Sequence, residues 1–280
     1  MSAMSAVETA STIEALLRES GLPRREAEIL LCSVLGCERV HLIAHAEDAV
    51  DSPGTRAARL CFSRRRSGEP VAYITGLREF YGLAMRVTPD VLIPRPETEQ
   101  LVELALERLP AGASARVLEL GTGSGAIAAA LAVQRPALTI AATDISEAAL
   151  KVARRNAREH ALEIDFVRSD WFEAIDPGPF DLIVSNPPYV ADGDPHLGRG
   201  DLRFEPSVAL IGGADGLACI REIAAGARRH LRAGGSLLLE HAYDQGEVCL
   251  ALLRGLGYSG VAGFRDLAGL PRVCAASWLG

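Results

Sequence analysis

From residue 116 to residue 240, short β-prone runs alternate with stretches of helical character, and this pattern restricts the possible folds most strongly. The β-prone runs are Val117–Leu120, Leu138–Thr143, Ile164–Arg168, Asp181–Ser185 and Ser236–Glu240. Helix-like stretches at 124–134, 146–160 and 216–231 lie between them. Such alternation predicts an α/β fold, in which helices cover both faces of a parallel sheet and ligands bind at the carboxyl ends of the strands.

Two later β-prone runs lie close together in the sequence, near Tyr258–Phe264 and Arg272–Trp278. No helical stretch separates them. We therefore expect an antiparallel pair of strands at one edge of the sheet.

The first part of the chain carries helix start and stop signals instead. Ser11-x-x-Glu14 is a capping box for a helix that ends at Gly21, and Pro23 begins a second helix that ends near Gly36. A third helix is expected from Cys37 to about His45, and a fourth from Ser52-Pro53 to near Gly68. These signals predict a small all-α domain over residues 1–72.

Between Tyr73 and Val87 the pattern becomes short and strand-like, with glycines at 76 and 82. We expect a β-hairpin linker over residues 73–90, which leads into the α/β domain at 91–280.

Composition indicates an ordered protein with a sizeable core, because 49% of the 280 residues are hydrophobic and 23% are charged. The longest uncharged apolar stretch, Leu120–Gln134, is too short to span a bilayer. Met1–Ala10 lacks the basic and apolar regions of a secretory signal. We therefore expect a cytoplasmic protein that does not bind membranes.

Neither a metal site nor extensive binding to nucleic acid is expected. The cysteines show no C-x-x-C pair or neighbouring histidine at ligand spacing, and they are interpreted as small buried apolar residues rather than metal ligands or disulfides. They are Cys32, Cys37, Cys61, Cys219, Cys249 and Cys274. The formal net charge of −7 opposes loose binding to a polyanion.

A glycine-rich turn follows the first strand of the α/β region, at Gly121-Thr122-Gly123-Ser124-Gly125. Its glycines allow close approach of the backbone to a ligand, and the helix that follows begins with unpaired N–H groups. Asp144, at the end of the next strand, is suited to accept hydrogen bonds from both ribose hydroxyls. The pattern predicts an adenosine-containing cofactor, although Gly121-x-Gly123-x-x-Ala126 also satisfies a loosened dinucleotide fingerprint.

A second motif, Asn186-Pro187-Pro188-Tyr189, closes the apolar run Phe180–Ser185. Prolines fix φ and donate no backbone hydrogen bond, so their carbonyls and the Asn186 amide can accept hydrogen bonds from a planar NH2 group while Tyr189 holds its plane. The alternative is a proline-stiffened loop without a ligand.

The two motifs are expected to face each other, because in a doubly wound sheet the fourth strand lies beside the first. Asp170-Trp171, after the third strand, could contact the adenine ring, or the tryptophan could belong to the core. A site that binds a planar NH2 group through residues 186–189, beside an adenosine-containing cofactor, favours methyl transfer from S-adenosylmethionine. We call these residues the NH2 clamp. No residue set for hydride transfer accompanies it, which disfavours a dehydrogenase.

Together these motifs resemble one family, the N(5)-glutamine methyltransferases of peptide chain release factors. The resemblance extends from about residue 69 to the end. Besides the two motifs above, it rests on Glu69-Pro70-x-x-Tyr73-Ile74-x-Gly76, Phe80-Tyr81-Gly82, Leu92-Ile93-Pro94-Arg95-Pro96-Glu97-Thr98-Glu99, Arg203-Phe204-Glu205-Pro206, Gly212-Gly213-x-Asp215-Gly216 and Glu240-His241.

The resemblance implies a Rossmann-like, seven-stranded methyltransferase domain preceded by a helical, substrate-binding domain. It implies methylation of the glutamine amide in the Gly-Gly-Gln motif of class 1 release factors. Residues 121–125, Asp144, Asp170, Trp171 and Asn186 would bind the cofactor. Residues 186–189 would be catalytic and hold the glutamine, with the Asn186 and Pro187 oxygens accepting its two amide hydrogens.

Pro94–Glu99 would begin a helix that closes over the pocket, with Arg95 and Glu97 contacting substrate. Ordinary helix capping by Pro96 and Glu97 is the alternative. Ala242 stands where the family pattern has glycine, and the first 68 residues carry no family motif. The run Arg64-Arg65-Arg66 could contact an acidic partner or be a solvated helix end.

Three further alternatives remain open. The glutamine could belong to another translation protein. A methyltransferase for the exocyclic amine of adenine could use the same clamp, but it would require base flipping and a basic groove, which the acidic balance disfavours. An adaptor that binds release factors without catalysis would not need an intact Asn186 and Asp144.

Overall fold

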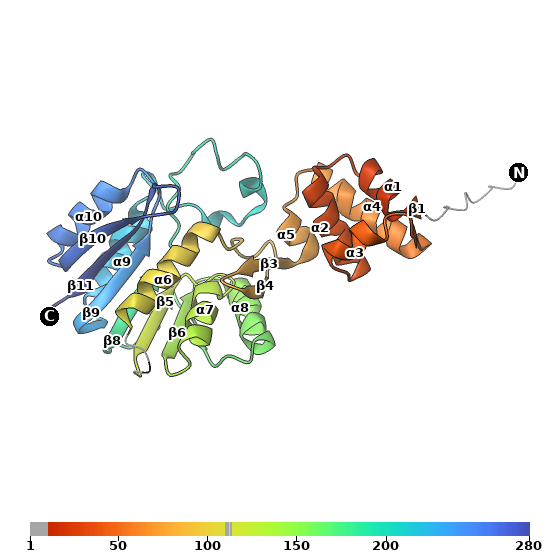
Figure 1. Ribbon diagram of the computed structural model, residues 1–280. Helices are drawn as coiled ribbons and strands as arrows, with labels where there is room; N and C mark the ends of the chain where they lie inside the picture. Colours follow the sequence, from red (N-terminus) through yellow and green to blue (C-terminus); the bar gives the residue numbers. More distant parts are fainter. Residues whose placement is uncertain (1–10, 110–111, 113) are drawn as a thin grey trace, which may run out of the picture. The chain divides into compact units, whose positions relative to one another are not determined.

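The structure is a computed structural model that describes residues 11–109, 112 and 114–280. Met1–Ala10, where the sequence predicts no secretory signal, lies outside these residues. The chain divides into two compact units, Met1–Gly76 and Leu77–Gly280 (Figure 1). None of the helices in the described ranges combines the length and apolar character needed to cross a bilayer.

The first unit contains α1 (Ile13–Glu19), α2 (Arg24–Leu35), α3 (Arg39–Ala44), α4 (Ser52–Arg66) and α5 (Val71–Thr75). Its apolar core includes Leu16, Leu30 and Phe62. A two-residue antiparallel pairing joins β1 (Ser11–Thr12) to β2 (Ala49–Val50).

The expected capping box at Ser11 is wrong by one residue. Thr12 caps α1, and its Oγ1 accepts a hydrogen bond from Ala15 N at 3.2 Å. Ser11 is instead paired in β1, and the Glu14 carboxylate bonds to Arg18 and Arg24 at 2.9 Å each. The sequence pattern therefore located the start of the helix correctly. Glu14, however, bonds to arginine side chains and not to the backbone N–H of the capping residue.

The basic run at the end of α4 makes contacts within the first unit. Arg64 pairs with Glu69 at 2.5 Å, Arg65 pairs with Glu26 at 2.7 Å, and Arg66 donates to the Ser20 carbonyl at 2.7 Å. The run is a helix end with Arg66 exposed, as one interpretation expected, and its guanidinium groups also bond to neighbouring segments of the first unit.

Residues 73–75 were expected to be strand-like, but they form the end of α5. Pro70 sets the start of this helix, and Gly76 ends it in the left-handed conformation at φ +72°. The hairpin begins one residue later, as β3 (Leu77–Phe80) and β4 (Leu83–Arg86). Its two turn residues, Tyr81 and Gly82, have φ values of +50° and +78°, as a type I′ turn requires.

The second unit contains the expected mixed sheet, which has seven strands in the order β10-β11-β9-β8-β5-β6-β7. The parallel strands are β5 (Arg116–Leu120), β6 (Thr139–Asp144), β7 (Asp165–Arg168), β8 (Phe180–Ser185) and β9 (Leu231–Glu240). The antiparallel strands β10 (Ser259–Arg265) and β11 (Pro271–Trp278) complete the sheet at the β10 edge, which confirms the expected pair.

Helices cover both faces of this sheet (Figure 1). One face packs against α6 (Glu99–Arg108) and α7 (Ala126–Gln134), with α8 (Glu147–Glu159) beside α7. The other face packs against α9 (Ala218–Ala227) and α10 (Gly246–Gly255), a helix that the sequence reading did not identify. Successive strand residues point to opposite faces, so Val184 packs with α7 while Ile183 packs with α9.

Strand register brings the predicted motifs to the same edge of the sheet. Leu120 pairs with Thr143 on one side and with Ser185 on the other. The glycine turn and Asn186 therefore directly follow β5 and β8, next to Asp144 at the end of β6.

All six cysteines are free thiols. Only Cys249 and Cys274 are fully buried, so the interpretation of all six as buried core residues was too broad. Among the residues that the structure describes, no group of three or more His, Cys, Asp or Glu could hold a metal ion.

Candidate active site

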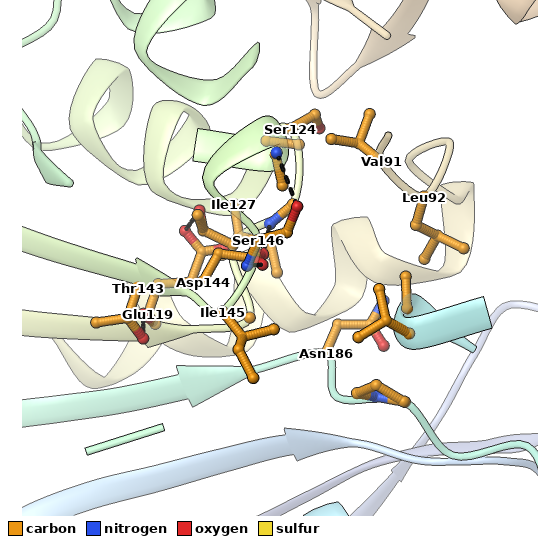
Figure 2. A pocket seen from close by; sticks show the side chains of 18 of the residues that line it. Val91, Leu92, Glu119, Ser124, Ile127, Thr143, Asp144, Ile145, Ser146 and Asn186 are labelled. Atoms are coloured by element: carbon orange, nitrogen blue, oxygen red, sulfur yellow. Dashed lines mark hydrogen bonds between the residues drawn. The ribbon is translucent and has the colours of Figure 1, made fainter. Parts of the chain in front are cut away.

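The carboxyl ends of the central strands open into a cavity of about 410 Å³. Figure 2 shows Glu119, Asp144 and Asn186 around this space. The predicted site residues that line it are Gly121, Thr122, Gly123, Ser124, Asp144, Asp170, Trp171, Asn186 and Pro188. The predicted residues Gly125, Pro187, Tyr189, Arg95 and Glu97 lie outside its lining. The structure thus joins the glycine turn and the start of the second motif in one cavity.

Asp144 organises the loops on one side of the cavity. Its Oδ2 accepts from Gly123 N at 2.8 Å, and its Oδ1 accepts from Ser146 N at 2.9 Å. Ser146 in turn caps α8, because its Oγ accepts from Ala149 N at 3.2 Å. Burial raises the pKa of Asp144, while these backbone N–H groups oppose that rise. The carboxylate therefore holds the glycine turn and the start of α8 at a fixed spacing.

Glu119 is a cavity residue that the sequence reading missed. It is 1% exposed in β5, and its Oε2 accepts from Thr122 Oγ1 at 2.7 Å and from Ala128 N at 3.0 Å. Burial raises the pKa of Glu119 to about 8. A single carboxylate within the apolar run 117–120 was the signal that could have revealed it, since an isolated charge in a buried strand requires partners.

Asn186 lies at the carboxyl end of β8 with its amide held on one side. Asn186 Nδ2 donates to Thr98 Oγ1 at 3.1 Å, and Thr98 is 4% exposed at the end of the 3-10 turn Pro96–Thr98. Because one N–H of the amide donates to Thr98, Oδ1 is left as the acceptor atom of Asn186 for a ligand. Thr98 also lines the cavity, so the segment before α6 contributes directly to the site.

Tyr189 is tied to the protein at its hydroxyl and at its carbonyl. Its Oη donates to Glu240 Oε1 at 3.3 Å, and its carbonyl accepts from Gln245 Nε2 at 3.0 Å. Burial raises the pKa of Tyr189 and also raises that of Glu240, to about 7. Glu240 is 1% exposed at the end of β9. The sequence motifs predicted no role for the side chains of Glu240 and Gln245.

Two glycines of the segment 212–216 pack directly against the backbone of the second motif. A Cβ on Gly212 would lie 2.5 Å from the Pro188 carbonyl oxygen, and one on Gly216 would lie 2.3 Å from that of Tyr189. Gly216 also has a φ of +71°, a conformation that favours glycine. Only residues without a side chain allow this backbone contact.

Trp171 lies between the cavity and the core. Its indole lines the cavity and packs against the apolar cluster under α9. The position of a Cβ on Gly121 would be 3.6 Å from Trp171 Cζ3, so the ring lies against the glycine turn. The core interpretation is therefore confirmed for one side of the ring, while contact of the other side with a ligand stays a prediction.

Arg95 and Glu97 are placed differently from each other. Arg95 Nη2 pairs at 2.5 Å with Glu205 Oε1, whose side chain is fully buried. Burial raises the pKa of Glu205, and Arg95 opposes that rise. Glu97 is exposed. The ion pair ties the segment before α6 to the loop that follows the second motif.

Comparison with known proteins assigns the chain to a family. Residues 98–199 match the Methyltransferase small domain, and residues 8–76 match the PrmC N-terminal domain. The release factor glutamine methyltransferase of Neisseria gonorrhoeae is 49% identical over 271 residues, which cover 96% of this chain and 98% of that protein. The protein of the same name from Bordetella pertussis is 50% identical over 259 residues, covering 92% and 96%.

A crystal structure of a methyltransferase from Pyrococcus furiosus has the same fold. Its TM-score is 0.55 at 23% identity, with 78% of this chain and 97% of that chain covered. Because about half of the residues are identical to those of near full-length relatives, the chain belongs to the release factor glutamine methyltransferase family.

Proposed function

We propose that this enzyme transfers a methyl group from S-adenosylmethionine to the side-chain amide of the glutamine in the Gly-Gly-Gln motif of class 1 release factors. One observation carries the proposal. The Asn186 amide, with its nitrogen turned to Thr98, borders the same cavity as the glycine turn and Asp144. The names of the relatives support the choice of substrate.

The residues of the cavity fit S-adenosylmethionine. A volume of about 410 Å³ lies within the range of pockets for small cofactors. Gly121 and Gly123 line it without side chains, and Asp144 stands beside them as an acceptor for ribose hydroxyls. Trp171 offers an aromatic edge to the adenine. When bound, the cofactor supplies an electrophilic methyl group on a sulfonium sulfur.

The protein's own residues would prepare the substrate nitrogen. An amide nitrogen is a poor nucleophile because its lone pair is delocalised into the carbonyl. Hydrogen bonds from its N–H groups to Asn186 Oδ1 and to the Pro187 carbonyl would return electron density to it and fix its direction. Catalysis then comes from positioning and from fixed acceptors, without a strong base before attack.

Tyr189 is proposed to pack on the plane of the substrate amide. Its hydroxyl and its carbonyl are already bonded to Glu240 and Gln245, which limits the movement of the ring. The helical domain, residues 1–72, is proposed to bind the release factor. A release factor substrate also implies a cytoplasmic enzyme.

The test is incubation of the protein with methyl-labelled S-adenosylmethionine and a purified class 1 release factor. A matched release factor carries alanine in place of the Gly-Gly-Gln glutamine. We expect label only on the unaltered release factor. Label on both would redirect the search to another residue, and label on added DNA or RNA would favour an adenine-directed enzyme.

A further inference from the structure

An asparagine clamp works in only one of two orientations. The oxygen and nitrogen of its amide occupy nearly the same volume, so rotation by half a turn exchanges an acceptor for a donor. With the nitrogen toward the cavity, Asn186 would present N–H groups to the N–H groups of a substrate amide. Something other than shape must therefore select the orientation.

A single hydrogen bond to Thr98 selects the orientation of the Asn186 amide. Its Oγ1 accepts from Asn186 Nδ2 at 3.1 Å, although 88 residues separate them in the sequence. Thr98 is 4% exposed, so water does not readily replace its hydroxyl as a partner. Figure 2 shows Asn186 beside the cavity on the loop that leaves β8.

A hydroxyl can accept or donate, so its own proton must also be directed. The carboxylate of Glu240 is the neighbouring acceptor, and the hydroxyls of Thr98 and Tyr189 both favour its ionised form. Tyr189 Oη reaches Glu240 Oε1 at 3.3 Å, while Oε2 is buried without a hydrogen-bond partner among the described residues. When Glu240 is ionised it can only accept, which leaves the lone pair of Thr98 Oγ1 for the Asn186 nitrogen.

We propose that Thr98 is a positioning residue for catalysis, which fixes the Asn186 amide with its oxygen toward the substrate. In its ionised form, Glu240 assists as an acceptor for the Thr98 proton. This inference rests on the proposed function, in which Asn186 Oδ1 accepts from the substrate amide. It assigns a role to a residue that touches the reacting amide only through Asn186.

The kinetic test compares Thr98→Val with Thr98→Ser. Valine keeps the shape of threonine without the hydroxyl, and serine keeps the hydroxyl without the methyl group. For the valine variant we expect kcat/KM for the release factor to fall about 10-fold or more, as for one lost hydrogen bond. We expect the serine variant to stay within about 3-fold of the unaltered enzyme, and both to keep their Kd for S-adenosylmethionine. Equal losses in the two variants would overturn the proposal.

A second readout does not depend on turnover. Hydrogen exchange of the Asn186 side-chain NH2, followed by NMR and assigned by its absence in Asn186→Asp, reports whether its nitrogen is bonded. We expect slow exchange in the unaltered and Thr98→Ser proteins and fast exchange in Thr98→Val. Equal exchange in all three overturns the positioning role. Absence of methyl transfer by the unaltered enzyme instead overturns the proposed function and leaves this readout intact.

Discussion

Gly216→Ala tests whether close backbone packing holds the second motif in place. The new Cβ would lie 2.3 Å from the Tyr189 carbonyl oxygen and 2.8 Å from Gln245 Nε2, at a φ of +71°. Gly193→Ala is the matched control, because Gly193 has a φ of +76° and nothing within 4 Å of its Cβ position. Both variants bear the left-handed strain of about 1–2 kcal/mol. Only Gly216→Ala must also displace backbone, at a cost of about 1–3 kcal/mol more.

The two variants should therefore separate in stability and in turnover. For a unit of this size, the additional cost corresponds to a melting temperature lower by roughly 2–12 °C in Gly216→Ala than in Gly193→Ala. A shifted Tyr189 carbonyl should lower kcat by about 10-fold or more, since small misplacements of a positioning group are costly. The Kd for S-adenosylmethionine should change little. Equal melting temperatures and equal kcat in the two variants would refute the reasoning.

Three further predictions concern single side chains at the cavity. Asn186→Ala should cost about 1.5–3 kcal/mol in kcat/KM for the release factor; an equal loss of cofactor affinity contradicts its assignment to the substrate. Asp144→Ala should weaken binding of S-adenosylmethionine first, and an unchanged Kd by calorimetry contradicts the ribose assignment. Glu119→Gln should remove a pH dependence of stability. Because burial raises the pKa of Glu119 from its ordinary value of 4.5 to about 8, the native state keeps a proton that the unfolded chain loses. The free energy of unfolding of the unaltered protein therefore falls as pH rises between about 4.5 and 8, by up to about 1.4 kcal/mol per pH unit. Denaturation of both proteins between pH 5 and 8 measures this; equal pH dependence in the variant and the unaltered protein would show the assignment to be wrong.

The sequence predicted what depends on local pattern and on the rules of sheet topology. The alternation after residue 116 predicted the parallel strands, and the doubly wound arrangement predicted that β8 lies beside β5. It followed that Asn186 would meet the glycine turn, and the two do line one cavity. The two wrong predictions are also local. Thr12 caps the first helix in place of Ser11, and Pro70 and Gly76 delimit a short helix where residues 73–75 were expected to be strand-like.

What the sequence could not reveal is which distant side chains support the site. Thr98, Glu240 and Gln245 lie far from residues 186–189 in the sequence, and only the folded sheet brings them together. The ion pair between Arg95 and the buried Glu205 illustrates the same limit, because 110 residues separate the two in the sequence. Propensity and spacing contain no information on such tertiary pairs.

The central claim is that a carboxamide, held by fixed oxygen atoms, receives the methyl group at its nitrogen. The most direct measurement is mass spectrometry of the release factor after reaction, with fragmentation across its Gly-Gly-Gln motif. The account predicts one added methyl group on the glutamine side-chain nitrogen, which Asn186→Ala should add at a rate lower by roughly 10- to 150-fold. A methyl group on another residue, or an unchanged rate of methylation by Asn186→Ala, would contradict it.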